Sequence, residues 1–264
     1  MPFVDHAAAR LHWRADGPAD RPALVLGNSL GADLGMWDPL MPALRARFRV
    51  VRFDNRGHGK STLQPATQGS DFSIELLAHD ALAVADAAGV ACFHYLGLSI
   101  GGMVGIWLGR HHSERLQRLV LSNTAARMPS GVWAERIAAV RAGGVATQVG
   151  STMERWFTSA WRQRQENRAT LERVQATFLA VDVDGYLGCA AAIRDMDLRG
   201  ELPHVAVPTL VLTGTFDPST PSALGRAIAD GIRGAQRVEL GAAHMPPIEQ
   251  PENYASAVIR FLDA

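Results

Sequence analysis

Short apolar runs alternate with helix-like stretches along most of this chain of 264 residues. Six of the runs are too short for helices, and they are typical of buried parallel strands. They cover residues 23–26, 48–53, 93–96, 119–121, 209–212 and 238–240, with helical patterns at 38–47, 73–88, 102–110, 221–232 and 252–262. The alternation predicts an α/β fold with a mostly parallel, doubly wound sheet, to which the residues before Val25 add one or two edge strands.

The alternation stops after Asn123 and resumes near Val207. The residues between them form helical segments that carry Trp and Phe side chains, and they contain no run typical of a buried strand. We therefore predict a first core segment (1–126), a helical insertion after the sixth strand (127–199) and a second core segment (200–264). Parallel sheets bind ligands at the carboxyl ends of their strands, so an insertion lying there would form a lid over the site.

The balance of charges narrows the class of partner. Lysine and arginine number 26, aspartate and glutamate also number 26, and the formal net charge is zero at pH 7. Such a chain is poorly suited to nucleic acid or an anionic membrane surface, so we expect a small-molecule ligand. Cys92 and Cys189 have no metal-ligand spacing, which favours two buried thiols in a reduced protein. Residues 1–14 contain charges and no continuous apolar stretch, so we expect no signal peptide, no membrane anchor and a cytoplasmic location.

The segment Gly97-Leu98-Ser99-Ile100-Gly101 joins the predicted strand at 93–96 to the helix that begins at residue 102. A serine on such a turn has a strained backbone and an exposed hydroxyl, and the two glycines allow strand and helix to approach closely. The positive end of the helix points to the same place. This context makes Ser99 the candidate nucleophile.

A serine hydroxyl needs a base that takes its proton and a carboxylate that orients the base. Of the nine histidines, only His244 follows the last predicted strand, in a loop of turn residues at 241–247. Four other histidines have core, surface or turn positions: His58, His94, His111 and His112.

Asp217 lies in the loop that leaves the strand at 209–212, which makes it the candidate carboxylate. The competing acids are Asp195 and Asp197 in the insertion and Asp54, to which we assign a turn-stabilising role. The reaction also needs donors to the oxygen that becomes negative during attack. We assign these to two backbone N–H groups, those of Ile100 after the nucleophile and Leu30 in the loop at 27–31.

With these features the chain resembles the α/β-hydrolase superfamily along its whole length, through residues 54–61, 97–101, 214–217 and His244. Within that superfamily, the segments 28–31, 36–38, 123–127, 155–157 and 190–195 are similar to the 3-oxoadipate enol-lactonases of aromatic catabolism. The resemblance implies hydrolysis of a five-membered enol-lactone that carries an acetate group, with no metal or organic cofactor.

The acetate group of such a substrate needs a cationic partner in the lid, for which Arg127 and Arg194 are the candidates. For either arginine, the alternative is a structural salt bridge with an acid of the lid such as Glu135 or Asp195. Trp133 and Trp156 are candidates for the pocket wall, with packing in the core of the lid as the alternative.

Three other functions fit the same fold. A carboxylesterase or a carbon–carbon bond hydrolase would use the same triad, and a ligand-binding receptor would keep the fold with little or no turnover. Dehalogenases and epoxide hydrolases are disfavoured. Enzymes of this fold with those activities resemble one another in using an aspartate as nucleophile, whereas the corresponding turn of this chain carries Ser99.

Overall fold

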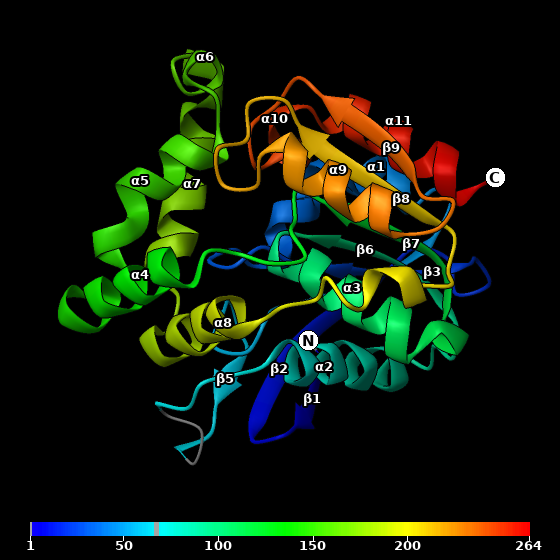
Figure 1. The fold of residues 1–264 in the computed structure, drawn as a ribbon, viewed down its shortest axis with the longest axis horizontal. Coiled ribbons are helices and arrows are strands. Elements are labelled where there is room, and N and C mark those ends of the chain that lie inside the picture. The colour runs from blue at the N-terminus through cyan, green and yellow to red at the C-terminus, as the bar shows by residue number, and fades with distance from the viewer. Residues whose placement is uncertain (1, 66–68) are drawn as a thin grey trace.

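A mixed sheet of nine strands forms the centre of the computed structural model, which describes residues 2–65 and 69–264 (Figure 1). The strands are β1 (Phe3–His6), β2 (Ala9–Asp16), β3 (Ala23–Gly27), β4 (Arg49–Phe53), β5 (Thr62–Leu63), β6 (Phe93–Leu98), β7 (Leu116–Ser122), β8 (Thr209–Gly214) and β9 (Gln236–Leu240). The sheet runs in the order β1-β2-β4-β3-β6-β7-β8-β9, and β5 pairs with β2. Strands β3, β4 and β6 to β9 are parallel, while β1, β2 and β5 pair antiparallel.

All six predicted apolar runs form strands, and β1 and β2 are the predicted additions before Val25. Two details were wrong. The run at 238–240 was expected to be buried, but β9 is largely exposed because it is the last strand and has a neighbour on one side only. The two-residue strand β5 was not predicted, so the helical insertion follows the seventh strand and not the sixth. A strand of two residues is too short to show periodicity.

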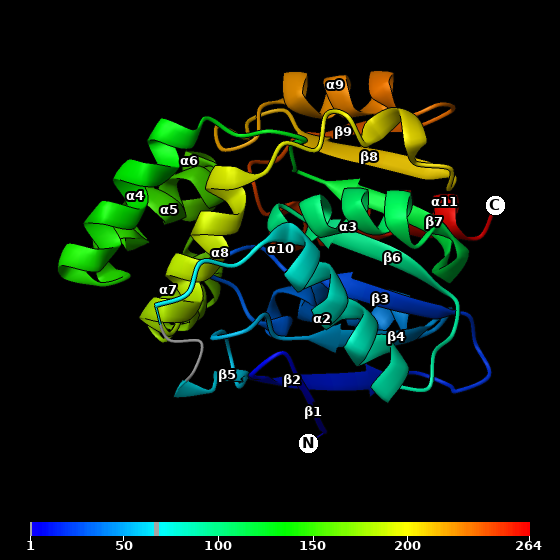
Figure 2. The same ribbon diagram turned by 60° about the horizontal axis from the view of Figure 1, so that its bottom comes forward.

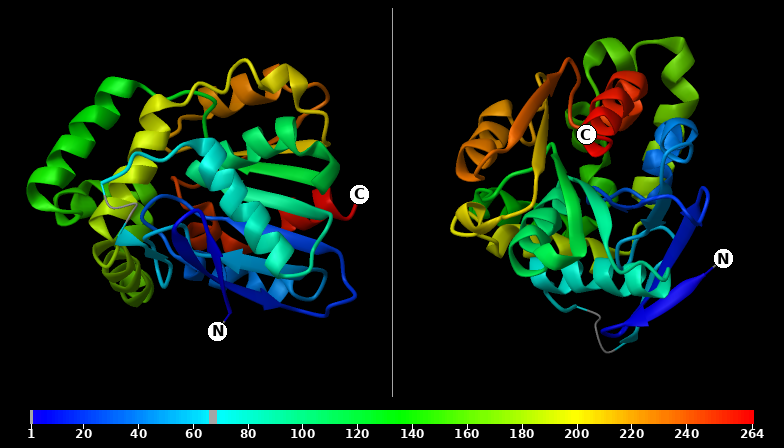
Figure 3. Two further views of the ribbon diagram at one scale, coloured as in Figure 1. Left: turned by 90° about the horizontal axis from the view of Figure 1, so that it is seen from below. Right: turned by 90° about the vertical axis from the view of Figure 1, so that its right-hand side faces the viewer.

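Helices cover both faces of the sheet (Figure 3). Helices α2 (Ile74–Ala87), α3 (Ile100–His111) and α9 (Ser222–Gly231) lie on one face, and α1 (Met41–Leu44) and α11 (Pro251–Leu262) lie on the other. The helix predicted at 38–47 is instead a 3₁₀ segment, η1 (Leu34–Leu40), followed by the single turn of α1. Pro39 and Pro42 lack the N–H that a continuous α-helix needs there.

The helical insertion contains α4 (Ser130–Gly143), α5 (Ala146–Trp156), α6 (Ser159–Arg162), α7 (Arg168–Leu179) and α8 (Val183–Asp195). These helices gather at one end of the sheet (Figures 1 and 2). The two ends of the insertion meet at an antiparallel bridge between Arg127 and Asp197, beside a hydrogen bond of 2.7 Å from the Leu198 N–H to the Ala126 carbonyl. The insertion therefore leaves the core and returns to it at one place.

Among the described residues, no single helix is long and apolar enough to cross a membrane. Only residues 165–179 with 183–195 meet both criteria together, as a pair of helical segments bent by 91°.

The cysteines differ from the prediction in one respect. Cys189 is buried in α8, but Cys92 is exposed, because it lies in the loop before β6 and not within the sheet.

Candidate active site

Ser99 lies at the point where the order of strands reverses. After β3 the chain adds β4 on one side, and β6 then pairs with the other side of β3. Loops that leave two such strands diverge and open a crevice, which is where sheets of this type bind ligands. The loop after β3 carries Leu30, and the turn after β6 carries Ser99. The sheet topology thus brings the predicted nucleophile and the predicted oxyanion loop to one crevice.

The turn at Ser99 has the strained geometry expected from the sequence. Its backbone has φ +59° and ψ −119°, a region that residues with side chains rarely adopt. A Cβ on Gly97 would lie 2.1 Å from the Gly101 carbonyl oxygen, and one on Gly101 would lie 2.3 Å from the Gly27 carbonyl oxygen. Only glycine fits at 97 and 101, and this close approach holds Ser99 at the tip of the turn.

His244 and Asp217 form a buried pair. The Nδ1 atom of His244 lies 2.8 Å from Oδ2 of Asp217, and both side chains are almost fully buried. The other oxygen of Asp217 accepts the N–H groups of Ser219 and Thr220, and the Thr220 hydroxyl donates to Oδ2 at 2.6 Å. The pair has the arrangement that orients an imidazole as a general base.

Burial alone would raise the pKa of the Asp217 carboxyl. The positive charge of His244 and hydrogen bonds from His244, Thr220 and Asn123 outweigh burial and lower this pKa to about 2. Asp217 is therefore ionised throughout the neutral range, which is what the stabilisation of a protonated imidazole requires.

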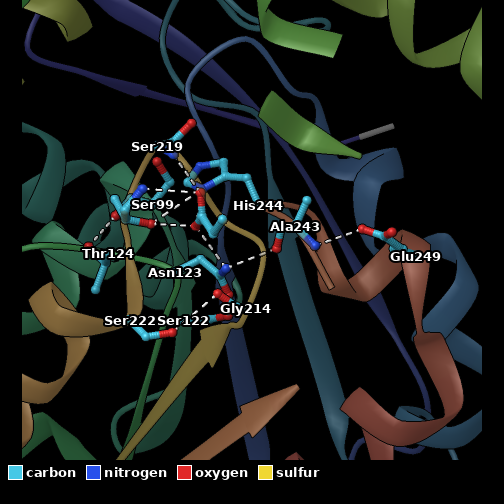
Figure 4. A network of polar contacts seen from close by, with 12 residues as sticks. Ser99, Ser122, Asn123, Thr124, Gly214, Ser219, Ser222, Ala243, His244 and Glu249 are labelled. Atoms are coloured by element: carbon cyan, nitrogen blue, oxygen red, sulfur yellow. Dashed lines mark hydrogen bonds and ion pairs between the residues drawn. The ribbon is translucent and has the colours of Figure 1, made fainter. Parts of the chain in front are cut away.

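Ser99 and His244 line one cavity of about 140 Å³, between the carboxyl end of the sheet and the helical insertion. Figure 4 shows both residues within one polar network. The cavity is smaller than the pockets that hold drug-sized ligands, which suits a substrate of few atoms. The predicted nucleophile and base thus share one cavity, with the orienting carboxylate behind the base.

Two backbone N–H groups beside the nucleophile lack a hydrogen-bond partner among the described residues. They are those of Leu30, which lines the cavity, and Ile100, the first residue of α3. Free N–H groups at a helix start attract a developing negative charge. Both of the predicted oxyanion donors are therefore available.

The structure does not bring Arg127 or Arg194 to this cavity. Arg127 is half exposed and lies 3.6 Å from the Asp197 carboxylate at the base of the insertion. Arg194 donates hydrogen bonds to Asp71 at 2.9 Å and Asp195 at 2.6 Å. Of the two alternatives for these arginines, the structural salt bridge is the one formed and a place in the cavity is not, because both guanidinium groups are held by carboxylates outside the cavity.

The predicted wall residues Trp133 and Trp156 do line the cavity. So do Arg136 of α4 and Arg155 of α5, which were not singled out in the sequence, although Arg155 belongs to one of the segments shared with the enol-lactonases. Arg136 stacks on the Trp133 ring at 4.4 Å, which is a contact between residues three apart on a helix. The spacing of Trp133 and Arg136 is visible in the sequence. Which face of α4 meets the cavity is not, so the place of Arg136 in the cavity could not be predicted.

The two cavity arginines lie close enough to influence each other. Burial, followed by the like charge of Arg136, lowers the pKa of Arg155 to about 10, so the Arg155 guanidinium remains charged at neutral pH. Arg155 donates to the Thr152 hydroxyl at 2.9 Å. Among the described residues that line the cavity, none is acidic, and the two arginines are the basic side chains besides His244. The lining is therefore suited to an anion.

The competing acids and histidines have structural positions. Asp54 accepts hydrogen bonds from His12 Nδ1 at 2.7 Å and from the backbone N–H groups of Leu34 and Lys60, so it stabilises the turn at 54–61 as predicted. Asp195 and Asp197 form the surface ion pairs described above. His58 is buried in the turn at 54–61, away from the lining of the cavity. Among the described residues, no group of three or more histidine, cysteine or acidic side chains could hold a metal ion.

Comparisons with known proteins agree with this geometry. A family model described as the alpha/beta hydrolase fold matches residues 22–251. The chain is 34% identical to 3-oxoadipate enol-lactonase 1 of Acinetobacter baylyi, over 96% of this chain and 92% of that protein. It superposes on the crystal structure of the enol-lactonase from Burkholderia xenovorans with a TM-score of 0.94 and 36% identity, over the full length of both.

A second solved structure, a hydrolase from Pseudomonas aeruginosa, is 41% identical with a TM-score of 0.94, over 100% of this chain and 98% of that one. The match of the family model, the full-length similarity to these proteins and the serine turn of the parallel sheet agree with one another. The chain therefore belongs to the α/β-hydrolase family, as an ester or lactone hydrolase.

Proposed function

We propose that this chain is a serine hydrolase that opens 3-oxoadipate enol-lactone to 3-oxoadipate. The observation that carries the proposal is the pair Arg136 and Arg155, which line the same cavity as Ser99, where no described residue of the lining is acidic. The enol-lactone bears a carboxylate beside its reactive ring. The carboxylate matches the arginine pair of the cavity, and the ring matches the nucleophile Ser99. The name of the similar protein from Acinetobacter baylyi supports the same substrate, and that of the protein from Burkholderia xenovorans supports an enol-lactone.

The arginine pair favours a charged substrate on energetic grounds. Burial and, after it, the like charge of Arg136 lower the pKa of Arg155, so holding two positive charges in one partly buried cavity is unfavourable. A bound carboxylate would relieve this repulsion and accept charge-assisted hydrogen bonds from the guanidinium groups. An uncharged ester would supply neither guanidinium group with an anionic partner. The cavity is therefore better suited to a carboxylate-bearing lactone than to a simple ester.

The first half of the proposed reaction is acylation of Ser99. His244 takes the proton of the Ser99 hydroxyl as the oxygen attacks the ring carbonyl, and Asp217 stabilises the imidazolium. The N–H groups of Leu30 and Ile100 donate to the negative oxygen of the tetrahedral intermediate. The ring C–O bond then breaks, and His244 gives its proton to the ring oxygen, which leaves as an enol. The enol becomes a ketone, which draws the opening forward.

The second half releases the acyl group. His244 takes a proton from a water molecule, and the resulting hydroxide attacks the acyl carbonyl on Ser99. The intermediate breaks down to 3-oxoadipate, and His244 returns the proton to the serine oxygen.

We propose that the helical insertion (127–199) acts as a lid, in which Trp133 and Trp156 form the wall and exclude other water. Free Cys92 and Cys189 fit the cytoplasmic location expected for such an enzyme.

A comparison of two substrates tests the proposal. We expect kcat/KM for the enol-lactone to exceed that for an uncharged aryl acetate by about 100-fold or more, which corresponds to one or two charge-assisted hydrogen bonds. A general carboxylesterase would prefer the aryl acetate, and a receptor would turn over neither. Either of those two results would contradict the proposed substrate.

A further inference from the structure

Asn123 lies at the junction of the strands that carry the triad. Strand β7 runs between β6, whose end leads to Ser99, and β8, whose end leads to Asp217. Asn123 is the first residue after β7, and its backbone N–H donates to the Leu212 carbonyl in β8 at 2.9 Å. The position is central to the site although the residue does not line the cavity.

The side-chain amide of Asn123 joins the two loops that form the histidine–aspartate pair. Its Nδ2 atom donates to Oδ2 of Asp217 at 2.9 Å and to the carbonyl of Ala243, the residue before His244, at 3.2 Å. Its Oδ1 atom accepts the Ser122 hydroxyl at 3.0 Å. The residue is fully buried, so no water competes for these bonds. Figure 4 shows the amide between Ser122 and Ala243.

The backbone of Asn123 is strained, and the contacts of its side chain explain why this position carries asparagine. Its φ is +43°, a left-handed conformation in which asparagine is tolerated better than most residues and glycine best of all. A glycine would satisfy the backbone at this position but would supply no amide. A strained residue that persists beside a reactive group points to a role in function.

The residues on either side of Asn123 hold the nucleophile. The Ser122 carbonyl accepts the Ser99 N–H at 3.0 Å, and the Thr124 hydroxyl donates to the Ser99 carbonyl at 2.7 Å. We propose that Asn123 is a positioning residue, whose amide fixes the Asp217 carboxylate and the His244 loop relative to Ser99. This inference rests on the proposed function, since it assumes that the three residues act as a triad.

The chemistry of Oδ2 of Asp217 makes the proposal testable. This oxygen accepts bonds from His244, Thr220 and Asn123 at once. Removing the Asn123 donor leaves more negative charge on the oxygen, which favours the protonated imidazole. The acidic limb of the rate profile should then move to higher pH. The other charged groups of the cavity, Arg136 and Arg155, stay the same in such a variant.

The experiment compares Asn123→Gly and Asn123→Ala with the wild type on an aryl acetate. The glycine variant relieves the backbone strain and removes the amide, whereas the alanine variant removes the amide and keeps the strain. We expect both to lower kcat by about 10- to 100-fold with KM within about twofold, since one bond to a charged group is lost. We also expect the acidic limb of the pH profile to shift upward in both.

A purely structural role for Asn123 gives the opposite pattern. Asn123→Gly would then keep kcat within about twofold and an unchanged pH profile, and this result would overturn the proposal. If Asn123→Gly melts far below the wild type, Ser122→Ala decides, because it removes only the hydroxyl that anchors the amide oxygen. We expect kcat of Ser122→Ala to fall about threefold or more, and an unchanged kcat would also overturn the proposal.

Labelling by a fluorophosphonate probe, followed by mapping of the modified residue, separates this inference from the proposed function. A wild-type protein that is not labelled at Ser99 contradicts the triad itself. A labelled and active wild type with fully active Asn123 variants contradicts only the role of Asn123.

Discussion

The carboxylate of Glu249 joins the N–H of Ala243 to the helical insertion. One oxygen accepts the Ala243 N–H at 2.8 Å, and the other accepts the N–H and hydroxyl of Thr158, between α5 and α6. On the other side of His244, the Met245 N–H donates to the Trp156 carbonyl at 3.0 Å. The loop that carries His244 is thus bonded to the insertion on both sides, and the position of one fixes the position of the other.

Glu249→Gln should lower kcat/KM by about tenfold, because a glutamine that accepts from Thr158 presents its NH₂ group to the Ala243 N–H. Steady-state kinetics on an aryl acetate measures this, with melting temperature as a control for unfolding. Thr158→Val keeps the bond to Ala243 and should lose less activity. Equal losses in the two variants would show that the Ala243 contact has no separate role.

Ser99→Ala should lower turnover by about a millionfold while the fold stays intact, because the members of a triad act as one unit. The sensitive measurement is single-turnover hydrolysis of the enol-lactone, with circular dichroism to confirm folding. Ser219→Ala, a second hydroxyl at the cavity, is the matched control and should keep most of its activity. Near-normal hydrolysis by Ser99→Ala would end the serine mechanism.

Acid stability should depend on Asp217. Its pKa in the folded protein is about 2, against about 3.8 for the unfolded chain, so ionised Asp217 stabilises the fold at pH above 4. That contribution is lost as the pH falls from about 4 towards 2. Urea unfolding of wild type and Asp217→Asn at several pH values should show a stability difference that is constant near pH 6 and shrinks below pH 4.

Asp197→Asn is the control for this measurement. The hydrogen bond from Arg199 lowers the pKa of Asp197 to about 2 as well, but its carboxylate is at the surface, where solvent screens the interaction. We expect its replacement to change acid stability very little. A pH-dependent loss equal to that of Asp217→Asn would show that the buried pair contributes nothing of its own.

Replacing the cavity arginines should separate charged from uncharged substrates. We expect Arg136→Ala and Arg155→Ala to raise KM for the enol-lactone by about 10- to 100-fold and to change KM for an aryl acetate far less. Arg127→Ala and Arg194→Ala, whose side chains are paired outside the cavity, are matched controls. Equal losses for both substrates in the cavity variants would exclude these arginines as carboxylate anchors.

Local sequence signals were sufficient for much of the fold and for the candidates of the triad. Buried parallel strands are continuous apolar runs, and the turn at Ser99 requires glycines on both sides, so both leave a local signature. Arg136 and Asn123 leave none. Their importance comes from the face of α4 that meets the cavity and from the neighbours of β7 in the sheet, and tertiary packing decides both. The pairing of Arg127 with Asp197 and of Arg194 with Asp71 is hidden for the same reason, since these residues become neighbours only in the folded chain. The pair Arg194 and Asp195 is adjacent in the sequence and was expected as an alternative.

The bridge between Arg127 and Asp197 has a consequence for how this enzyme can change its substrate. Because the insertion enters and leaves the core at one pair of bridged residues, its replacement would leave unbroken the chain segments that carry Ser99, Asp217 and His244. The contacts of the His244 loop with Trp156 and Thr158 would have to be rebuilt. With the insertion in its proposed role as a lid, selectivity and reactivity would then lie in separable segments of the chain. A chimera that joins residues 1–126 and 200–264 to the insertion of another family member should keep its nucleophile and acquire a new substrate range, provided that Glu249 finds a hydroxyl equivalent to that of Thr158.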